Sequence, residues 1–238
     1  MNKGNLKYLV PNGITFLSLI SGVVSILASS QEILLLSGAM IFSSYWLDML
    51  DGFSARKLNA QSAFGLNLDS LTDMVSLGVA PSLLVFQHLR LLGANLIWVI
   101  PMVSLIPLTG AFRLARFNTL PTKTSSNKDS LGLTISHSGF TLALAVLADN
   151  LAPSVFLPIL FYIPLLLLLG AMMVSRIPCP PSQWFFMEHK LGWVLLGSLL
   201  LLLIILPLFS TWFIIYIVYI LVSTGRALKN KLKPGFQT

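Results

Sequence analysis

Four aspartates stand within 26 residues of a segment that otherwise has the composition of a membrane helix. Asp48 and Asp51 are three residues apart, and Asp69 and Asp73 are four apart, so on helices the members of each pair share one face. A charged side chain near the bilayer centre costs about 2.5–3.5 kcal/mol on insertion scales, so these carboxylates need a compensating partner. Their spacing indicates a divalent metal site that holds a phosphate-bearing substrate.

The ligand types restrict the metal. Four carboxylates carry a charge of about −4, which two divalent cations would neutralise. Hard oxygen ligands without His or Cys favour Mg²⁺, Mn²⁺ or Ca²⁺ over zinc, and paired ions contact both the attacking and the leaving oxygens of an in-line displacement. We expect two divalent ions, Mg²⁺ or Mn²⁺, with Ca²⁺ as a substitute under crystallisation conditions.

Small residues and an arginine continue both acidic faces, and they are Gly52, Ala55, Arg56 and Gly65. Small residues allow a flat group or a pyrophosphate to approach the backbone, and Arg56 offers bidentate recognition of phosphate. Beyond Asp73 the second face continues through Ser76 and Ala80. Two helices of this kind, joined near Leu58–Phe64, would bring their carboxylates to one cavity.

Three other interpretations of the acidic residues compete with a metal site. An Asp-Gly pair followed by Ser and Arg also suits a plain interhelical turn, in which aspartates cap helices at the water interface. Intramembrane carboxylates also line cation and proton transporters, and a scaffold without catalysis is the third option. None of the three explains why glycines, an alanine and an arginine are in register with the carboxylates.

The composition is that of a polytopic membrane protein. Of the 238 residues, 55% are hydrophobic and 10% are charged, whereas soluble domains carry about a quarter of charged residues. A span needs about 20 helical residues, and apolar runs fall at 9–29, 32–50, 70–88, 91–112, 138–149, 153–174, 191–209 and 211–225. We expect an all-α bundle of about eight spans that forms a single integral membrane domain, residues 1–238.

The fifteen basic residues are distributed unevenly over this arrangement. With the N-terminus in the cytoplasm, fourteen of them fall on the cytoplasmic side, namely Lys3, Lys7, Arg56, Lys57, Arg113, Arg116, Lys123, Lys128, Arg176, Lys190, Arg226, Lys229, Lys231 and Lys233. Arg90 is the exception. This positive-inside pattern places both termini and the Asp48–Asp73 segment at the cytosolic face of the membrane. It also accounts for the net charge of +7 without nucleic acid as a partner.

The pattern D-x2-D-G-x2-A-R-x8-G-x3-D-x3-D is typical of the CDP-alcohol phosphotransferases, and Asp48–Asp73 resembles it without a gap. The resemblance implies a six-helix membrane core, usually dimeric, that uses Mg²⁺ or Mn²⁺. It also implies roles for the residues. Asp48, Asp51, Asp69 and Asp73 would be metal ligands, and Asp73 would be the base for the acceptor hydroxyl. The nucleotide and its phosphates would lie against Gly52, Ala55, Arg56 and Gly65.

A second polar cluster follows the run 91–112. Arg113 and Arg116 are three apart and share a face, and Asn118 comes two residues later. Two fixed cations beside a metal site could hold a donor lipid phosphate or an acceptor carboxylate. The alternative is a positive-inside anchor, in which the arginines only reach the lipid headgroups.

Three strings resemble the membrane-integral phosphatidylserine synthases, a bacterial and archaeal branch of the family: RLARFN (113–118), LGVAPSLLVF (77–86) and MVSRIPCP (173–180). The resemblance covers about 8–180, the expected catalytic core, and leaves 181–238 as further helices and a basic tail. It implies a homodimer in a cytoplasmic membrane that transfers a phosphatidyl group from CDP-diacylglycerol to L-serine. Glycerol 3-phosphate, inositol phosphate and choline are alternative acceptors.

One segment departs from this branch. These synthases usually carry a Gly-Leu-Pro-x-Pro-like turn after the cytosolic loop, whereas residues 132–139 read GLTISHSG. Both prolines are absent and His137 appears. We expect the turn to lie near the active cavity and His137 to make a local hydrogen bond. His88 and His189 are expected at membrane interfaces, without a role.

Overall fold

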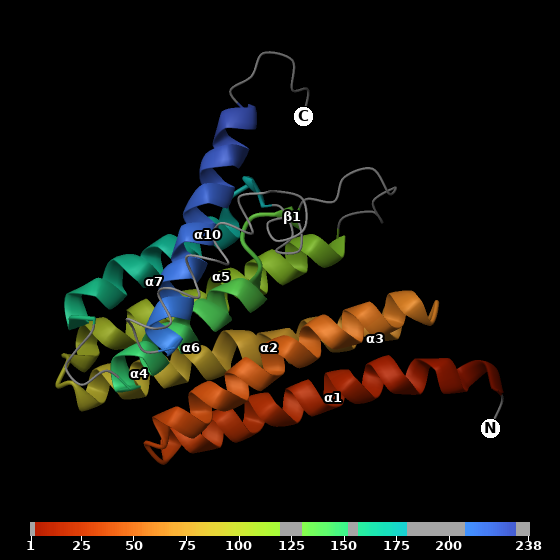
Figure 1. Ribbon diagram of the computed structural model, residues 1–238, viewed down its shortest axis with the longest axis horizontal. Coiled ribbons are helices and arrows are strands. Elements are labelled where there is room, and N and C mark those ends of the chain that lie inside the picture. The colour runs from red at the N-terminus through yellow and green to blue at the C-terminus, as the bar shows by residue number, and fades with distance from the viewer. Residues whose placement is uncertain (1–2, 120–129, 152–156, 180–207, 232–238) are drawn as a thin grey trace.

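The chain folds into a bundle of long helices (Figure 1). The computed structural model describes residues 3–119, 130–151, 157–179 and 208–231. The helices are α1 (Lys3–Ser30), α2 (Leu34–Lys57), α3 (Ala63–Asp73), α4 (Ala80–Leu91), α5 (Leu96–Thr119), α6 (Ile135–Leu151), α7 (Ile159–Val174) and α10 (Leu208–Lys231), with a π-helical segment η1 (Met74–Val79) between α3 and α4. Strands β1 (Ser130–Leu131) and β2 (Pro178–Cys179) form one short antiparallel pair.

The prediction of an all-α membrane protein is confirmed. Three segments, Lys7–Ser30, Ala63–Leu91 and Leu96–Thr119, are long and apolar enough to cross a membrane, and Ile159–Val174 and Phe213–Val222 are shorter apolar helices. Each predicted apolar run except 191–209 coincides with a helix, and residues 191–207 of that run lie outside the described residues. The number of eight spans therefore stays a prediction.

The centre of the bundle is α6, although its apolar run is too short for an ordinary span. Apart from His137, every residue from Ile135 to Asp149 is buried. The helix packs against α2, α4, η1 and α10. A helix that is apolar or small on all sides belongs in the interior, because it has no polar face to turn toward water.

Small polar residues join α1 to α2. The Ser18 and Ser44 hydroxyl oxygens are 2.7 Å apart, and the Ser37 hydroxyl oxygen lies 2.8 Å from that of Ser25 and 2.7 Å from that of Ser29. In a bilayer, small side chains let helix backbones approach closely, and hydroxyl groups bond across the contact. This seam aligns the first turns of α1 with the acidic end of α2.

The approach of α6 to η1 is closer than any side chain would allow. A Cβ atom built on Gly139 would lie 2.1 Å from the Leu77 carbonyl oxygen and 2.9 Å from its carbonyl carbon. Only glycine fits at this crossing. The contact holds the first turn of α6 directly behind Asp73, the last residue of α3.

Gly139→Ala is expected to destabilise the protein, because the added methyl group forces α6 away from the backbone of η1. Overpacking of this kind costs about 1–3 kcal/mol. Thermal unfolding in detergent should therefore show a lower midpoint. Gly225→Ala is the matched control, since a Cβ at Gly225 on α10 meets nothing within 4 Å. Equal midpoints for the two variants would contradict the close crossing.

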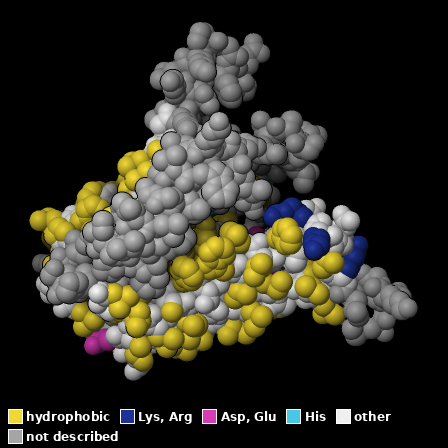
Figure 2. Space-filling model, in the orientation of Figure 1, with side chains coloured by type: hydrophobic (Ala, Val, Ile, Leu, Met, Phe, Trp, Pro, Cys, Tyr) yellow, Lys and Arg dark blue, Asp and Glu magenta, His cyan; other side chains and the backbone are white. Residues whose placement is uncertain are grey.

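Arg90, the one basic residue predicted to lie away from the cytoplasmic side, is at the end of the bundle far from Asp48–Asp73. Arg90 at the end of α4 donates a hydrogen bond to the carboxylate of Glu32, in the turn between α1 and α2. Figure 2 shows Lys and Arg side chains gathered at the opposite end, and apolar side chains over most of the described surface between. The charge of Arg90 is thus compensated locally.

The prediction that His88 lies at an interface without a role is wrong. Its side chain is buried, and its Nε2 lies 2.7 Å from Asp149 Oδ2. Asp149 Oδ1 also accepts a hydrogen bond of 3.1 Å from the Leu157 backbone N–H. The helical period turns His88 toward α6, so the pair ties α4 to α6 and to the residues that precede α7. His189 lies outside the described residues.

Aromatic side chains attach α10 to the core. The Tyr216 hydroxyl oxygen lies 2.8 Å from that of Tyr45 on α2, and the Tyr45 ring stacks on Phe140 of α6 with centroids 4.2 Å apart. The rings of Tyr216 and Tyr219 lie 5.6 and 5.7 Å from the His137 ring. The last helix therefore supports both α2 and the first turn of α6.

Candidate active site

The turn between α2 and α3 brings the two acidic helices together. It occupies 58–62, as the predicted junction near Leu58–Phe64 requires. Asn59 has a φ of 49°, a left-handed conformation that asparagine adopts more readily than most residues and that ends a helix. Ser62 caps α3, since its Oγ accepts a hydrogen bond of 3.0 Å from the Gly65 backbone N–H.

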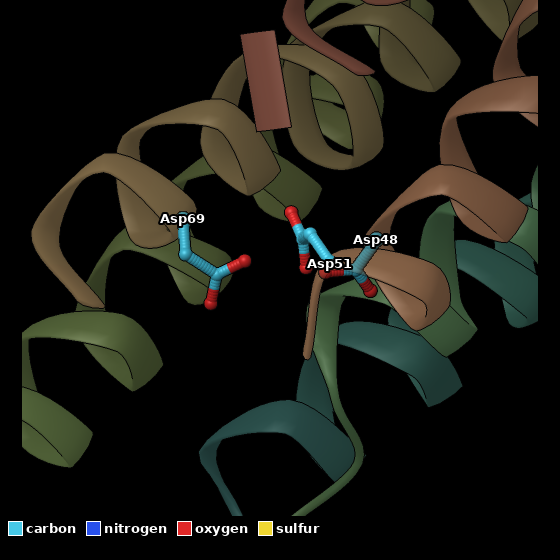
Figure 3. Close-up of side chains that lie close together, drawn as sticks. All are labelled: Asp48, Asp51 and Asp69. Carbon is cyan, nitrogen blue, oxygen red and sulfur yellow. The ribbon is translucent and has the colours of Figure 1, made fainter. Parts of the chain in front are cut away.

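Three of the predicted metal ligands meet at this end of the bundle. One carboxylate oxygen from each of Asp48, Asp51 and Asp69 lies within 4.8 Å of the others. Figure 3 shows Asp69 reaching from one helix toward Asp48 and Asp51 on the other. Carboxylates this close repel one another strongly in a partly buried environment, so a bound cation would stabilise their ionised forms.

Asp73 lies beside this group and is the more buried of the two aspartates on α3. It is 8% exposed, and its Oδ2 accepts a 3.4 Å hydrogen bond from the Ser136 hydroxyl. Its charge interacts with those of the other three aspartates and with that of Arg113. All four predicted carboxylates therefore share one electrostatic environment.

Sequence reasoning missed the contribution of α1. The Thr15 hydroxyl donates a 2.6 Å hydrogen bond to Asp51 Oδ2, and the side chain is buried. The Asn12 side-chain oxygen is 3.4 Å from the position of a Cβ on Gly65. The signal available in the sequence was a pair of polar residues three apart at the start of an otherwise apolar helix, just after Pro11.

The predicted nucleotide-binding residues border the carboxylates. The Arg56 guanidinium lies beside Gly52, with Nη1 3.4 Å from the position of a Cβ on that glycine. Arg56 is exposed, and Ala55 and Gly65 are half-buried. Around Gly52 a Cβ would meet no other side chain within 4 Å, so the backbone here is open to a ligand.

The two predicted arginines on α5 have different surroundings. Arg113 is 7% exposed and close enough to Asp73 and His137 for charge interactions. Arg116 donates hydrogen bonds of 3.0 and 3.3 Å to the carbonyl oxygens of Val174 and Ser175, at the end of α7. The cation thus lies where a helix presents its negative end.

Asn118, the third residue of that predicted cluster, faces α3. Its Nδ2 donates a 3.2 Å hydrogen bond to the hydroxyl of Ser70, the residue after Asp69. Both side chains belong to the exposed rim of the site. The structure therefore brings the end of α5 next to the acidic helices, as the sequence predicted.

The turn that departs from the family pattern adjoins the carboxylates. Thr134 caps α6, since its hydroxyl accepts a 3.2 Å hydrogen bond from the His137 backbone N–H, and it also lies 2.5 Å from His137 Nδ1. The local hydrogen bond expected of His137 is confirmed. Gly132 has a φ of 76° and donates its N–H to the Ile177 carbonyl oxygen at 2.9 Å, which anchors the turn beside β2.

The donor set suits a hard divalent cation. Mg²⁺ binds oxygen at about 2.0–2.1 Å, so ligands on opposite sides of one ion are about 4.2 Å apart. The three carboxylate oxygens lie within 4.8 Å of one another, close enough to approach one ion together. Among the described residues, these aspartates form the one group of three or more acidic, His or Cys side chains with this spacing.

A model of the CDP-alcohol phosphatidyltransferase family matches residues 8–177, which include every part of this site. The chain belongs to that family. Its members generally depend on divalent metals, which agrees with an acidic cluster able to bind one. The matched region ends before α10 begins.

Curated relatives in the family act on a serine acceptor according to their names. The chain is 34% identical over 221 residues to the CDP-diacylglycerol–serine O-phosphatidyltransferase of Helicobacter pylori, covering 90% of each chain. It is 32% identical to the enzyme of the same name from Methanocaldococcus jannaschii, covering 87% of this chain and 89% of that one. The archaetidylserine synthase of Methanothermobacter thermautotrophicus is 34% identical over 56% of each chain.

Proposed function

We propose that the protein transfers the phosphatidyl group of CDP-diacylglycerol to L-serine, yielding phosphatidylserine and CMP. The observation that carries the proposal is the convergence of Asp48, Asp51 and Asp69 on one point, in a chain of this family whose full-length relatives are named for this reaction. The acidic cluster fits the donor pyrophosphate, and the names of the relatives indicate the acceptor.

The proposed reaction is a direct displacement at phosphorus. The serine hydroxyl oxygen forms a bond to the phosphorus that carries the diacylglycerol. The bond from that phosphorus to the oxygen of CMP breaks, and CMP leaves with the bonding electrons. The serine proton passes to a carboxylate. Phosphoryl transfer of this kind depends on positioning and electrostatic stabilisation more than on a covalent protein intermediate.

We assign roles to residues from their places in the site. Asp48, Asp51, Asp69 and Asp73 would hold two divalent ions, Mg²⁺ or Mn²⁺, which when bound offset the charge on the pyrophosphate and on departing CMP. Asp73 would accept the serine proton, since it is enclosed beside the cluster and away from bulk water. Gly52, Ala55 and Gly65 leave space for the nucleotide, and Arg56 would contact its phosphates.

The acceptor would lie on the α5 side of the carboxylates. Arg113 is buried there near Asp73, so its cation is suited to the carboxylate of serine or the phosphate of the lipid. Arg116 would support the same region from its place at the end of α7. Asn118 would complete the polar rim next to Ser70.

Arg113→Ala is expected to raise the apparent KM for serine about tenfold or more, because a hydrogen bond to a charged group contributes about 1.5–3 kcal/mol. The KM for CDP-diacylglycerol should change by less than the KM for serine. Initial rates of CMP release, with each substrate varied in turn, measure both. A selective loss of CDP-diacylglycerol binding would reassign Arg113 to the donor phosphate.

The arrangement in the membrane completes the proposal. Both termini and the acidic site would face the cytosol, as the gathering of Lys and Arg side chains at one end supports (Figure 2). Residues 8–180 would form the catalytic core, and 181–238 would add helices and a basic tail. The working unit would be a homodimer in the cytoplasmic membrane of a bacterium or archaeon.

The test is an incubation of purified protein with CDP-diacylglycerol and a panel of alcohols, scored by CMP release and by the mass of the lipid product. Serine should give phosphatidylserine, whereas glycerol 3-phosphate, inositol phosphate and choline should give no product above background. Product formation with another alcohol would show that serine is not the acceptor, while the proposed displacement at phosphorus would stand. Ion flux through liposomes without CMP release would instead favour the transporter.

A further inference from the structure

Ser136 is a buried hydroxyl directly against the carboxylates. It lies in the first turn of α6, is 8% exposed, and donates a 3.4 Å hydrogen bond to Asp73 Oδ2. Ser136 thus connects α6 to the acidic helix α3. It occupies one of the two places where prolines stand in the turn typical of the serine-specific branch.

The direction of this hydroxyl differs from that of its neighbours. Ser138 and Thr141 on the same helix donate to the carbonyl oxygens four residues earlier, at 3.3 and 2.7 Å. Ser76 on η1 does the same with Thr72 at 2.8 Å. Ser and Thr hydroxyls in buried helices usually form their hydrogen bond in this way, to the backbone of their own helix. Ser136 donates across helices to a carboxylate.

The backbone around Ser136 is held on both sides, which fixes the place from which its side chain reaches the site. Thr134 caps α6 two residues before Ser136. His137 is hydrogen-bonded to Thr134 and packs against the rings of Tyr216 and Tyr219. Gly139 lies against the backbone of Leu77. A turn anchored in this way keeps the backbone of Ser136 within reach of Asp73.

We infer that Ser136 is a positioning residue for Asp73. A hydrogen bond to one carboxylate oxygen limits rotation of the carboxyl group and sets the direction from which Asp73 meets the acceptor hydroxyl. The inference rests on the proposed function, because the orientation of Asp73 matters to turnover only if Asp73 receives the serine proton.

The experiment compares Ser136→Ala and Ser136→Thr in the purified full-length enzyme. Ser136→Ala should lower kcat for CMP release about 10- to 100-fold, the range seen for groups that orient a catalytic ligand. The KM values for serine and CDP-diacylglycerol should stay within about twofold, because substrate contacts are retained. Ser136→Thr should restore most of kcat, since it keeps the hydroxyl. Mn²⁺ affinity, measured by electron paramagnetic resonance, should stay within about tenfold.

Ser138→Ala is the matched control. It removes a buried hydroxyl from the same turn, one that bonds only to its own helix backbone among the described contacts, and it should leave kcat unchanged. If Ser136→Ala proves unstable, Ser136→Cys takes its place. A thiol is similar in size but only a weak hydrogen-bond donor, so kcat should still fall in this variant.

The outcomes separate the inference from the function. Wild-type kcat in Ser136→Ala, or in Ser136→Cys if that variant is used, overturns the positioning role. So does a loss confined to the serine KM, which would make Ser136 an acceptor contact. A wild-type enzyme that releases no CMP with serine overturns the proposed function instead, and this is visible before any variant is made.

Discussion

Asp69→Asn should abolish phosphatidyl transfer while the protein remains folded in the membrane. Asp69 is the α3 member of the acidic group and reaches toward both carboxylates on α2 (Figure 3). An amide of the same shape keeps the packing but removes the negative charge and one anionic metal ligand. Substitution of residues that only hydrogen-bond to metal ligands already lowers activity about 10- to 100-fold. Removal of a ligand itself should therefore lower the rate of CMP release by more than about 100-fold.

The measurement is CMP release by purified variant and parent enzyme at equal concentration, with gel filtration in detergent to verify folding. Glu32→Gln is the control, because it removes the same charge at the opposite end of the bundle. Its turnover should match that of the parent. Asp69→Asn protein that elutes normally and still turns over at the parental rate would rule out Asp69 as a ligand.

Chelation should silence the enzyme reversibly. Without a divalent cation, the carboxylates around the site repel one another and attract no pyrophosphate. EDTA is expected to reduce CMP release to background, and an excess of Mg²⁺ or Mn²⁺ should restore it. Zn²⁺ should restore it poorly, because the described site offers oxygen ligands alone.

A second readout avoids dependence on activity. A cation that binds the folded state stabilises it by mass action, so Mn²⁺ should raise the midpoint of thermal unfolding in detergent. The increase should be absent from Asp69→Asn. Undiminished turnover in a metal-free, EDTA-treated preparation would refute a metal-dependent mechanism for this protein.

The acidic centre of the site could be predicted from the sequence because helical spacing determines which side chains share a face. Asp48 with Asp51 and Asp69 with Asp73 needed only the period of the helix and a short turn to be brought together, and the structure supplies both. The place of Arg113 at the same end followed from alternation of the helices.

The contributions of single hydroxyls could not be predicted in this way. Thr15 and Ser136 reach the carboxylates from α1 and α6. The spacing of Asn12 and Thr15 indicates a polar face on α1, but it does not indicate which residues that face contacts. The roles of Thr15 and Ser136 depend on how distant helices pack. His88 escaped prediction for the same reason, since its partner Asp149 lies 61 residues further along the chain.

The helical period itself changes in the middle of the site. The sequence predicts that Ser76 and Ala80 continue the face of Asp69 and Asp73. Ser76 packs closely against α1, since a Cβ on Gly22 would lie 2.4 Å from its Cβ. It lies in η1, whose wider turns begin at Met74, so the regular helical spacing assumed in that prediction does not hold beyond Asp73.

This change of pitch separates two tasks along the rod Ala63–Leu91. The half before Met74 carries Asp69 and Asp73, and the half after it carries Leu77, whose carbonyl group lies against Gly139 of α6. Deleting one residue of η1 would leave the spacing of the four aspartates unchanged. It would, however, rotate the Leu77 backbone away from α6. A homologue with such a deletion would pass a motif search and fail as a catalyst.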